Sequence, residues 1–260
     1  MNTPFSLSPD PRFLYLTAGL TTVVAKINFT IDSRQGLTCL LGDVGMGKTT
    51  LLRLVYDDYM GRTDVVCCFL SNPNFYSELA FVKGICTELG IKTKRSMFEQ
   101  ENELKFFLAE QYAIGKNVIV FIDEAQKLTG RMLEQVRAML NFESNSAKLI
   151  QFVLVAQMEL LDRLKDPSKK AIRSRIFAPS VLSPLSFEET REMVAYRCQI
   201  FNEKNPFPES VLEEVYTCAG GVPRDILHLC AMSYIIMKME GAASVTSSFL
   251  EKAKKEAVLP

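Results

Sequence analysis

The sequence has little of what several protein classes require. Its thirty Lys and Arg residues balance thirty Asp and Glu residues, so no excess of either sign is available for binding a charged polymer. Any nucleic-acid contact must therefore come from local patches. No apolar run approaches the ~18 residues that span a bilayer. The N-terminus, MNTPFSLSPDPRF, lacks the basic and apolar regions of a signal peptide. We therefore expect neither a membrane span nor a secretory leader.

Metal-binding and disulfide patterns are also missing. The sequence contains one histidine, His228, within the apolar segment ILHLCAM, and we interpret it as structural. No C-x-x-C pair occurs, which argues against a zinc site and against a disulfide framework and predicts a reducing cytoplasmic location. The seven cysteines are scattered through apolar segments: Cys39, Cys67, Cys68, Cys86, Cys198, Cys218 and Cys230.

The 260 residues, 48% of them hydrophobic, are enough for one large domain or a domain with a small lid. Continuous apolar strands alternate with helices, which predicts an α/β fold with a five-stranded parallel sheet covered on both faces. The predicted strands are Leu37–Leu41, Asp64–Leu70, Val118–Ile122, Leu149–Ala156 and Phe177–Leu182.

After Pro184 the pattern contains helices alone, beginning with a capping box at Ser186 and Glu189. The first residues are rich in proline and cannot form a regular helix; we expect an ordered arm that lies across the core. The predicted domains are an arm at 1–17, an α/β core at 18–182 and a small all-helical lid domain at 183–260.

The chain is organised around Leu37–Leu52, LTCLLGDVGMGKTTLL, which contains the phosphate-binding pattern G-x-x-x-x-G-K-[ST] between a strand and a helix. Gly42 and Gly47 let the backbone curl so that its N–H groups face an anion, and the helix N-terminus adds partial positive charge. Lys48 can reach the β- and γ-phosphates, and the Thr49 hydroxyl can ligate Mg²⁺. The alternative, a chance glycine turn, fits the flanking strand and helix poorly. The predicted phosphate-binding residues are Gly42, Asp43, Val44, Gly45, Met46, Gly47, Lys48, Thr49 and Thr50.

An acidic pair, Asp123 and Glu124, follows the apolar strand VIVFI. In a parallel sheet the carboxyl ends of the strands form the ligand-binding edge. Asp123 would hold Mg²⁺ through water, and Glu124 would polarise the attacking water. The alternative is an acidic helix cap after a buried strand.

Four further side chains suit a site that senses the γ-phosphate. Gln157 ends the fourth strand and can orient water; alternatively it is a plain strand-end polar residue. Arg173 and Arg175 can act in a neighbouring subunit's site, or belong to a solvated basic face. Arg224 follows Pro223 at the start of a lid helix and can reach the phosphates when the lid closes, or is an ordinary surface arginine.

Together these residues resemble an AAA+ ATPase, and more narrowly the ExeA-like ATPase of general secretion pathway protein A. The resemblance covers nearly the whole chain, and its motifs are PDPRFLYLT, GDVGMGKTTLLR, FIDEAQKL, LEQVRAMLNFE, LIQFVLVAQMEL, SPLSFEET and GGVPRDI. It implies ATP as the nucleotide, Mg²⁺, hydrolysis to ADP and phosphate, and assembly into a homo-oligomer. It also implies the roles assigned above, with Arg175 fitting the trans-acting arginine better than Arg173.

The biological role divides into three hypotheses. Secretion members of this family continue into a membrane span and a cell-wall-binding domain, which this sequence does not contain. The first hypothesis is a regulator of DNA transposition. The same module resembles the TnsC, TniB and MuB regulators, which assemble on double-stranded DNA as rings or filaments and recruit a transposase. For this hypothesis the predicted DNA contacts are Lys92, Lys94, Arg95, Lys127 and Arg131, which are otherwise solvated charges. The second hypothesis is a secretion or cell-envelope assembly ATPase acting on a protein partner, and the third is a nucleotide-dependent scaffold with little turnover.

Overall fold

The computed structural model describes residues 3–145 and 147–257. Contacts within the chain divide it into two compact units. The first, the sheet unit, comprises Ala18–Asp43 and Leu51–Leu182. The second, the helical unit, comprises the N-terminal segment up to Thr17, the loop Val44–Thr50 and the segment from Ser183 onward.

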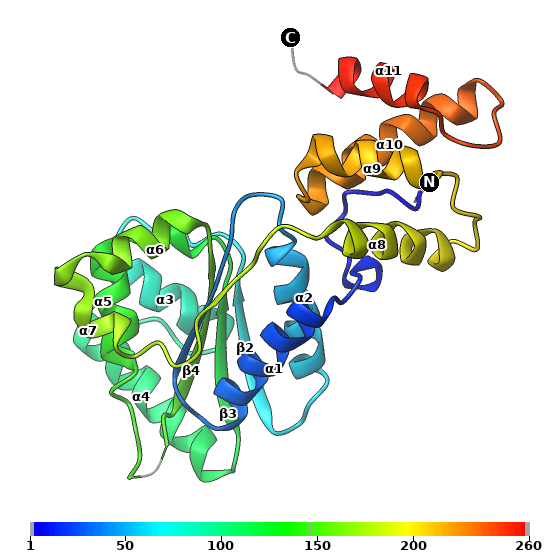
Figure 1. Cartoon of the computed structure of the whole chain (residues 1–260). Helices are drawn as coiled ribbons and strands as arrows, with labels where there is room; N and C mark the ends of the chain where they lie inside the picture. Colours follow the sequence, from blue (N-terminus) through cyan, green and yellow to red (C-terminus); the bar gives the residue numbers. More distant parts are fainter. Residues whose placement is uncertain (1–2, 146, 258–260) are drawn as a thin grey trace. The chain divides into compact units, whose positions relative to one another are not determined.

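The sheet unit contains one parallel sheet of five strands in the spatial order β2-β3-β4-β1-β5 (Figure 1). Strands β1, β3 and β4 are buried along their whole length, as expected for strands covered on both faces. This confirms the predicted α/β class and five-stranded parallel sheet. The strands are β1 (Leu37–Leu41), β2 (Val65–Leu70), β3 (Asn117–Ile122), β4 (Ile150–Ala156) and β5 (Ser180–Val181).

Strand β5 is much shorter than the predicted Phe177–Leu182. Ile176 pairs with Leu37 and Ser180 with Leu40, so the register shifts by one residue between these two points. The shift spans Pro179, which has no N–H to donate to the ladder. Thr38 Oγ1 instead donates to the carbonyl oxygen of Ala178 at 2.8 Å.

Helices cover both faces of the sheet, with α3 to α7 on one side and α1 and α2 on the other (Figure 1). The N-terminus of α4 carries a capping box that the sequence analysis does not identify, between Ser96 and Glu99. The helices are α1 (Ala18–Asp32), α2 (Lys48–Met60), α3 (Glu78–Glu88), α4 (Met97–Ala113), α5 (Gly130–Met139), α6 (Met158–Lys165) and α7 (Lys170–Arg173), with short 3-10 helices η2 (Ala125–Lys127) and η3 (Pro167–Lys169).

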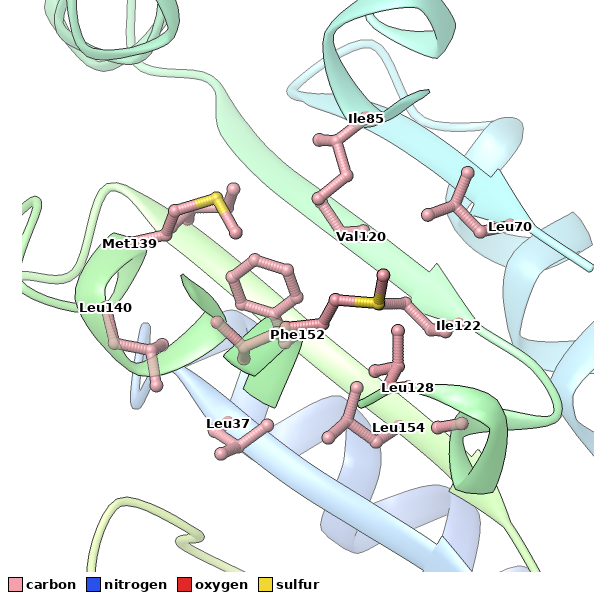
Figure 2. Close-up of a cluster of buried hydrophobic side chains, with 14 of the residues drawn as sticks. Leu37, Leu70, Ile85, Val120, Ile122, Leu128, Met139, Leu140, Phe152 and Leu154 are labelled. Carbon is pink, nitrogen blue, oxygen red and sulfur yellow. The ribbon is translucent and has the colours of Figure 1, made fainter. Parts of the chain in front are cut away.

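The core of the sheet unit follows the alternation of side chains along the strands. On one face, fully buried Val120 and Phe152 pack in a cluster with Ile85 of α3 and Met139 of α5 (Figure 2). On the other face, the ring of Phe121 lies 5.6 Å from that of Tyr56 on α2. Each layer of helices therefore has its own set of strand residues to pack on.

All seven cysteines are free thiols. Burial raises the pKa of Cys39 to about 12 and that of Cys86 to about 11. These thiols are therefore protonated and unreactive at neutral pH, as expected for cysteines that pack as small apolar residues.

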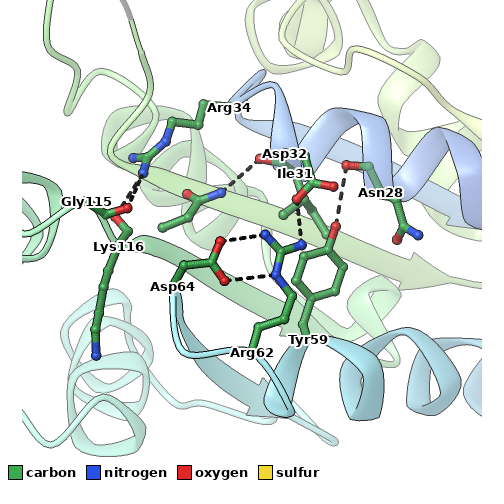
Figure 3. Close-up of polar contacts among 10 residues, drawn as sticks. Asn28, Ile31, Asp32, Arg34, Tyr59, Arg62, Asp64, Gly115 and Lys116 are labelled. Carbon is green, nitrogen blue, oxygen red and sulfur yellow. Dashed lines mark hydrogen bonds and ion pairs between the residues drawn. The ribbon is translucent and has the colours of Figure 1, made fainter.

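A polar network closes the amino-terminal edge of the sheet (Figure 3). Arg62 makes a two-pronged contact with Asp64, just before β2, and a third contact with Asp32 at the end of α1. Asn117, the first residue of β3, donates to the carbonyl oxygen of Ile31 at 2.9 Å. Arg34 donates to the carbonyl oxygen of Lys116 at 3.0 Å. We call these residues, Asp32, Arg34, Arg62, Asp64 and Asn117, the amino-edge network.

The helical unit consists of η1 (Pro11–Phe13), α8 (Phe187–Ile200), α9 (Glu209–Ala219), α10 (Pro223–Met239) and α11 (Ser247–Ala257). The predicted capping box of α8 is confirmed, because Ser186 accepts from the Glu189 N–H and Glu189 accepts from the Ser186 N–H. Within the two described segments, no helix is long and apolar enough to cross a lipid bilayer.

The N-terminal arm packs on these helices. Phe5 is fully buried, with its ring 5.3 Å from that of Phe207 and 5.5 Å from that of Tyr234. Arg197 of α8 is 6% exposed and donates to the carbonyl oxygens of Pro4 and Ser6. Burial lowers the pKa of Arg197 to about 10. The arm is ordered as predicted, but these contacts tie it to the helical unit, which corrects the expectation that it lies across the α/β core.

Candidate nucleotide site

The carboxyl ends of three neighbouring strands carry predicted site residues of the sheet unit. Because Leu41 pairs with Ala156 in the parallel sheet, Gly42 and Gln157 leave adjacent strands at the same level. Ile122 pairs with Leu154, so Asp123 leaves β3 beside them. The structure thus brings Asp123, Glu124 and Gln157 to one edge, where ligands bind in open parallel sheets.

The glycine loop joins β1 to the N-terminus of α2 at Lys48. Gly45 and Gly47 have positive φ angles of 86° and 82°, a conformation that other residues adopt only under strain. The prediction that Gly47 curls the backbone is therefore confirmed, but the second curl is at Gly45 and not at Gly42. Gly42 serves close packing, because a Cβ atom there would lie 3.2 Å from the Cβ of Leu182.

Arg224, the predicted lid arginine, lies beside this loop within the helical unit. Its backbone N–H donates to the carbonyl oxygen of Gly45 at 3.2 Å. A Cβ atom on Gly45 would come within 2.8 Å of Val222 and 3.1 Å of Arg224. The loop Val44–Thr50, which includes Met46, Lys48 and Thr49, is therefore packed against the first turn of α10. Its juxtaposition with the acidic pair of the sheet unit stays a prediction.

The acidic pair lies in a tight turn between β3 and η2. Asp123 is 5% exposed, and its Oδ1 accepts a hydrogen bond from the N–H of Glu124 at 2.9 Å. Glu124 has a φ angle of 54°, a left-handed conformation that is costly for a residue other than glycine. Such strain is retained mainly where a site needs one particular direction for a side chain.

A glutamine that the sequence analysis does not identify joins this pair to the next strand. Gln126 Nε2 donates to Glu124 Oε2 at 2.8 Å, and Gln126 Oε1 accepts from the backbone N–H of Gln157 at 3.1 Å. The side chain of Gln157 does not cap α6, and within the described chain it has no hydrogen-bond partner. It is therefore available to a ligand, as a γ-phosphate sensor requires.

Two more polar residues that the analysis does not identify hold this turn. Asn72, just beyond β2, accepts from Lys127 Nζ at 3.1 Å, and that nitrogen lies 3.9 Å from Glu124 Oε2. Arg163 on α6 donates to the carbonyl oxygens of Gln126 and Leu128 at 2.8 and 2.6 Å. The rule applied to Gln157, a polar residue directly after a buried strand, indicates Ser71 and misses Asn72, which lies one residue further along. No sequence signal distinguishes Arg163 from its basic neighbours.

The two candidate trans-acting arginines have different surroundings. Arg173 ends α7, and its guanidinium donates to the carbonyl oxygens of Leu164 and Lys165 at 3.3 and 3.1 Å, where α6 ends. Arg175 is half-buried and, across the described residues, forms no ion pair or side-chain hydrogen bond. The structure therefore leaves Arg175 the freer of the two.

The five predicted DNA contacts form two groups. Arg131 lies 3.6 Å from Glu78 at the start of α3, near Lys127. Lys92, Lys94 and Arg95 follow the other end of α3, whose 11 residues span roughly 16 Å. Lys94 pairs with Glu103 at 2.9 Å, whereas Lys92 and Arg95 are exposed. The two groups therefore lie near opposite ends of α3, and their contact with DNA stays a prediction.

Comparisons with known proteins agree with this fold. A family model described as AAA domain matches residues 31–164. General secretion pathway protein A of Aeromonas hydrophila is 30% identical over 261 residues, covering 97% of this chain and 46% of that protein. The chain therefore spans less than half the length of this relative.

Two solved structures share the fold over nearly the whole chain. The ORC2 protein of Aeropyrum pernix in ADPNP-ADP complexes has a TM-score of 0.72 at 18% identity, covering 99% of this chain and 72% of that one. The Drosophila ORC bound to DNA has a TM-score of 0.71 at 18% identity, covering 99% of this chain and 65% of that one. At identities this low, the similarity shows that the fold is shared and shows nothing about function.

Proposed function

Because the chain belongs to the AAA domain family and is an AAA+ ATPase, we propose that its glycine loop binds the phosphates of ATP and that the acidic edge of its sheet supplies the groups for hydrolysis. Lys48 binds the β- and γ-phosphates, Glu124 polarises the attacking water, and Gln157 orients it. Arg224 contacts the phosphates from the lid. The observation that supports this assignment is the edge itself, where the Glu124 carboxylate and the backbone N–H of Gln157 both bind the Gln126 amide and the Gln157 side chain does not cap α6.

The residues also suit a magnesium ion. Mg²⁺ binds through one or two protein oxygens together with water and phosphate oxygens. The Thr49 hydroxyl and the Asp123 carboxylate are oxygen ligands of this kind, and Asp123 is held at the end of β3. The ion supplies charge neutralisation on the β- and γ-phosphates when bound.

The site is tested with Lys48→Ala. Nucleotide affinity, measured with a fluorescent ATP analogue, is expected to fall, because the phosphates lose their charge partner. Lys26→Ala removes the same charge from an exposed position on α1 and should bind as the unaltered chain does. Equal affinity of the Lys48 variant and this control would refute the proposed site.

We further propose that the chain works as a homo-oligomer, a ring or a filament, in which Arg175 completes the site of a neighbouring copy. The freedom of Arg175 supports this choice over Arg173, which already binds the end of α6. Mixing Arg175→Ala with Glu124→Gln protein tests it. Each variant alone is expected to release little phosphate, and partial recovery of phosphate release in the mixture is expected if the arginine acts between copies.

The proposed working partner is double-stranded DNA, and the proposed role is regulation of DNA transposition with recruitment of a transposase. Exposed Lys92 and Arg95 on one side of α3, and Lys127 and Arg131 on the other, provide cations for phosphates. Tyr76 is 96% exposed in the segment between Asn72 and Glu78, the two residues that contact Lys127 and Arg131. An exposed aromatic ring among cations is typical of nucleic-acid surfaces. The Drosophila relative of the same fold is bound to DNA.

A salt titration of duplex binding, with and without ATP, tests this role. Binding is expected with ATP and should weaken steeply as salt rises. Lys92→Ala with Arg95→Ala should lower the slope of log affinity against log salt by about one per lost phosphate contact. Lys26→Ala with Lys255→Ala removes the same charge elsewhere and should leave the slope unchanged. Absent or salt-insensitive binding in the presence of ATP would contradict the role.

The second candidate is an ATPase for secretion or cell-envelope assembly that acts on a protein. The 30% identity to general secretion pathway protein A favours it. Retention of a membrane-anchored protein, with no DNA, in a pull-down with ATP would favour this candidate over the first.

A further inference from the structure

Gln126 has no assigned chemical step in the function proposed above, yet its side chain contacts two of the residues that do. Its amide joins the Glu124 carboxylate to the backbone N–H of Gln157, which lies 31 positions after Gln126 in the sequence. Glu124 ends the turn after β3, and Gln157 is the N-cap of α6 after β4. The inference below rests on the proposed ATPase site and concerns how that site is held.

The chemistry of the two contacts fixes the orientation of the amide. The N–H of Gln157 is a donor, so the Gln126 atom facing it must be the oxygen. The NH₂ group then faces Glu124, and an ionised carboxylate accepts such a bond well. Gln126 therefore satisfies an N–H at the start of α6, which is otherwise without a partner, and orients an acidic side chain.

Arg163 fixes the backbone that carries Gln126. Its two nitrogens bind the carbonyl oxygens of Gln126 and Leu128 from the last turn of α6. Ala125 and Leu128, on either side of Gln126 and Lys127, are buried in the core. Both ends of α6 therefore form hydrogen bonds to the turn that follows Asp123, and these bonds hold the turn and α6 together.

The bridge engages one carboxylate oxygen of Glu124. Oε2 accepts from Gln126 at 2.8 Å and lies 3.9 Å from Lys127 Nζ. In the parts of the chain that the structure describes, Oε1 has neither a hydrogen bond nor an ion pair. Because hydrogen bonds weaken steeply with distance, Gln126 is the stronger of the two contacts and leaves one oxygen to face water.

We propose that Gln126 is a positioning residue that fixes the Glu124 carboxylate relative to Gln157, so that the group that activates water and the γ-phosphate sensor move as one. The hydrogen bonds from Arg163 hold the backbone on either side of Lys127 and so make this coupling rigid. Gln126 acts through Glu124 and contacts neither nucleotide nor metal. Its loss should therefore slow hydrolysis without weakening nucleotide binding.

The test uses two variants of the full-length chain with ATP, Mg²⁺ and duplex DNA. Gln126→Leu removes both hydrogen bonds, and Gln126→Glu keeps the shape but removes the donor to Glu124. In each, kcat for phosphate release is expected to fall about tenfold to hundredfold, the effect of losing a hydrogen bond to a charged group. The KM for ATP should stay within about twofold of the unaltered value. Melting temperature, measured on each protein, reports folding, and Gln126→Glu keeps the test usable if Gln126→Leu is unstable.

Controls separate positioning from general stability. Gln111→Leu changes a half-buried glutamine on α4 and should leave kcat and KM unchanged. Arg163→Met should lower kcat in the same direction as Gln126→Leu. In a Glu124→Gln background, Gln126→Leu should cause no further loss, because it acts through the carboxylate.

Three outcomes would overturn the inference: a Gln126→Leu enzyme as fast as the unaltered one, a raised KM at unchanged kcat, or a loss that adds fully to that of Glu124→Gln. Failure of the proposed function is distinguishable. In that case the unaltered protein releases no phosphate, or Glu124→Gln leaves its release unchanged.

Discussion

The two edges of the sheet hold similar charged and amide side chains, but these side chains differ in their hydrogen-bond partners. At the amino edge, Nε and both terminal nitrogens of Arg62 bind Asp64 and Asp32. At the carboxyl edge, Glu124 is held in a left-handed turn with one oxygen bonded to Gln126, and the amide of Gln157 is unused within the described residues. At the first edge the charge of Arg62 is paired with two carboxylates, whereas the second edge holds the Glu124 side chain in a defined direction.

This difference indicates that the amino edge contributes to the stability of the fold and that the carboxyl edge is the candidate for catalysis. Exposed ion pairs such as those of Arg62 contribute only a little to folding. A strained backbone such as that of Glu124 costs stability and persists mainly where a function requires it. Substitutions at the amino edge should therefore change stability, and those at the carboxyl edge should change turnover.

The largest effect is expected from Glu124→Gln. Without a carboxylate to polarise water, phosphate release should fall by about 10²- to 10⁴-fold, while nucleotide binding is retained. Asp64→Asn makes the same charge change at the opposite edge and should leave the rate per folded molecule unchanged. Unchanged turnover in the Glu124 variant would remove the distinction between the edges and the role of Glu124.

Asn117→Leu should have the largest effect at the amino edge. It removes one hydrogen bond to the Ile31 carbonyl oxygen, which keeps the Arg34 N–H as its other donor, so the expected cost is about 0.5–1.5 kcal/mol in the free energy of unfolding. Urea denaturation measures this cost. Asn141→Leu, at an exposed position, should cost far less, and a turnover defect in the Asn117 variant would contradict the comparison.

Arg62→Met should have a smaller effect. The arginine side chain is 37% exposed, so its ion pairs are screened by solvent, and their loss should cost about 1 kcal/mol or less. The cost, measured by urea denaturation, should shrink further as salt is raised. A loss as large as that of Asn117→Leu would show that the ionic pairs, and not the buried amide, dominate this edge.

The smallest expected effect is a pH dependence at the same edge. The hydrogen bond from Arg62 holds the pKa of Asp64 below its ordinary value of 3.8. A lowered carboxyl pKa contributes stability that is fully present above the ordinary value and is lost as pH falls through the lowered one. The difference in unfolding free energy between the unaltered chain and Asp64→Asn should therefore shrink below about pH 4. A difference that grows on acidification would show the opposite sign.

Sequence patterns predict the fold well because the relevant forces are local and periodic. Runs such as Val118–Ile122 are apolar at every position, which a strand buried on both faces requires. The phosphate-loop pattern fixes where β1 ends and α2 begins, since it needs Gly47 before Lys48. Once the structure is known, Pro179 also explains why β5 is shorter than predicted.

The hydrogen bonds that position the site residues cannot be predicted from sequence patterns in this way. Gln126 and Gln157 meet because β3 and β4 pair in one register, and that register depends on packing of the whole core. Arg163 belongs to a basic stretch that is equally consistent with a solvated surface, yet its guanidinium binds backbone carbonyls. The arm is similar: a proline-rich segment predicts the absence of helix but not which surface it covers.

The packing of that arm has a consequence for biosynthesis. Phe5 and the carbonyl oxygen of Ser6 are synthesised before their partners Arg197, Phe207 and Tyr234, which follow roughly 190 to 230 residues later. At about 5–20 residues per second this is a wait of roughly ten to forty-five seconds. During that interval the arm displays an unprotected aromatic side chain to chaperones and proteases, and the helical unit cannot complete its core until α10 has been synthesised.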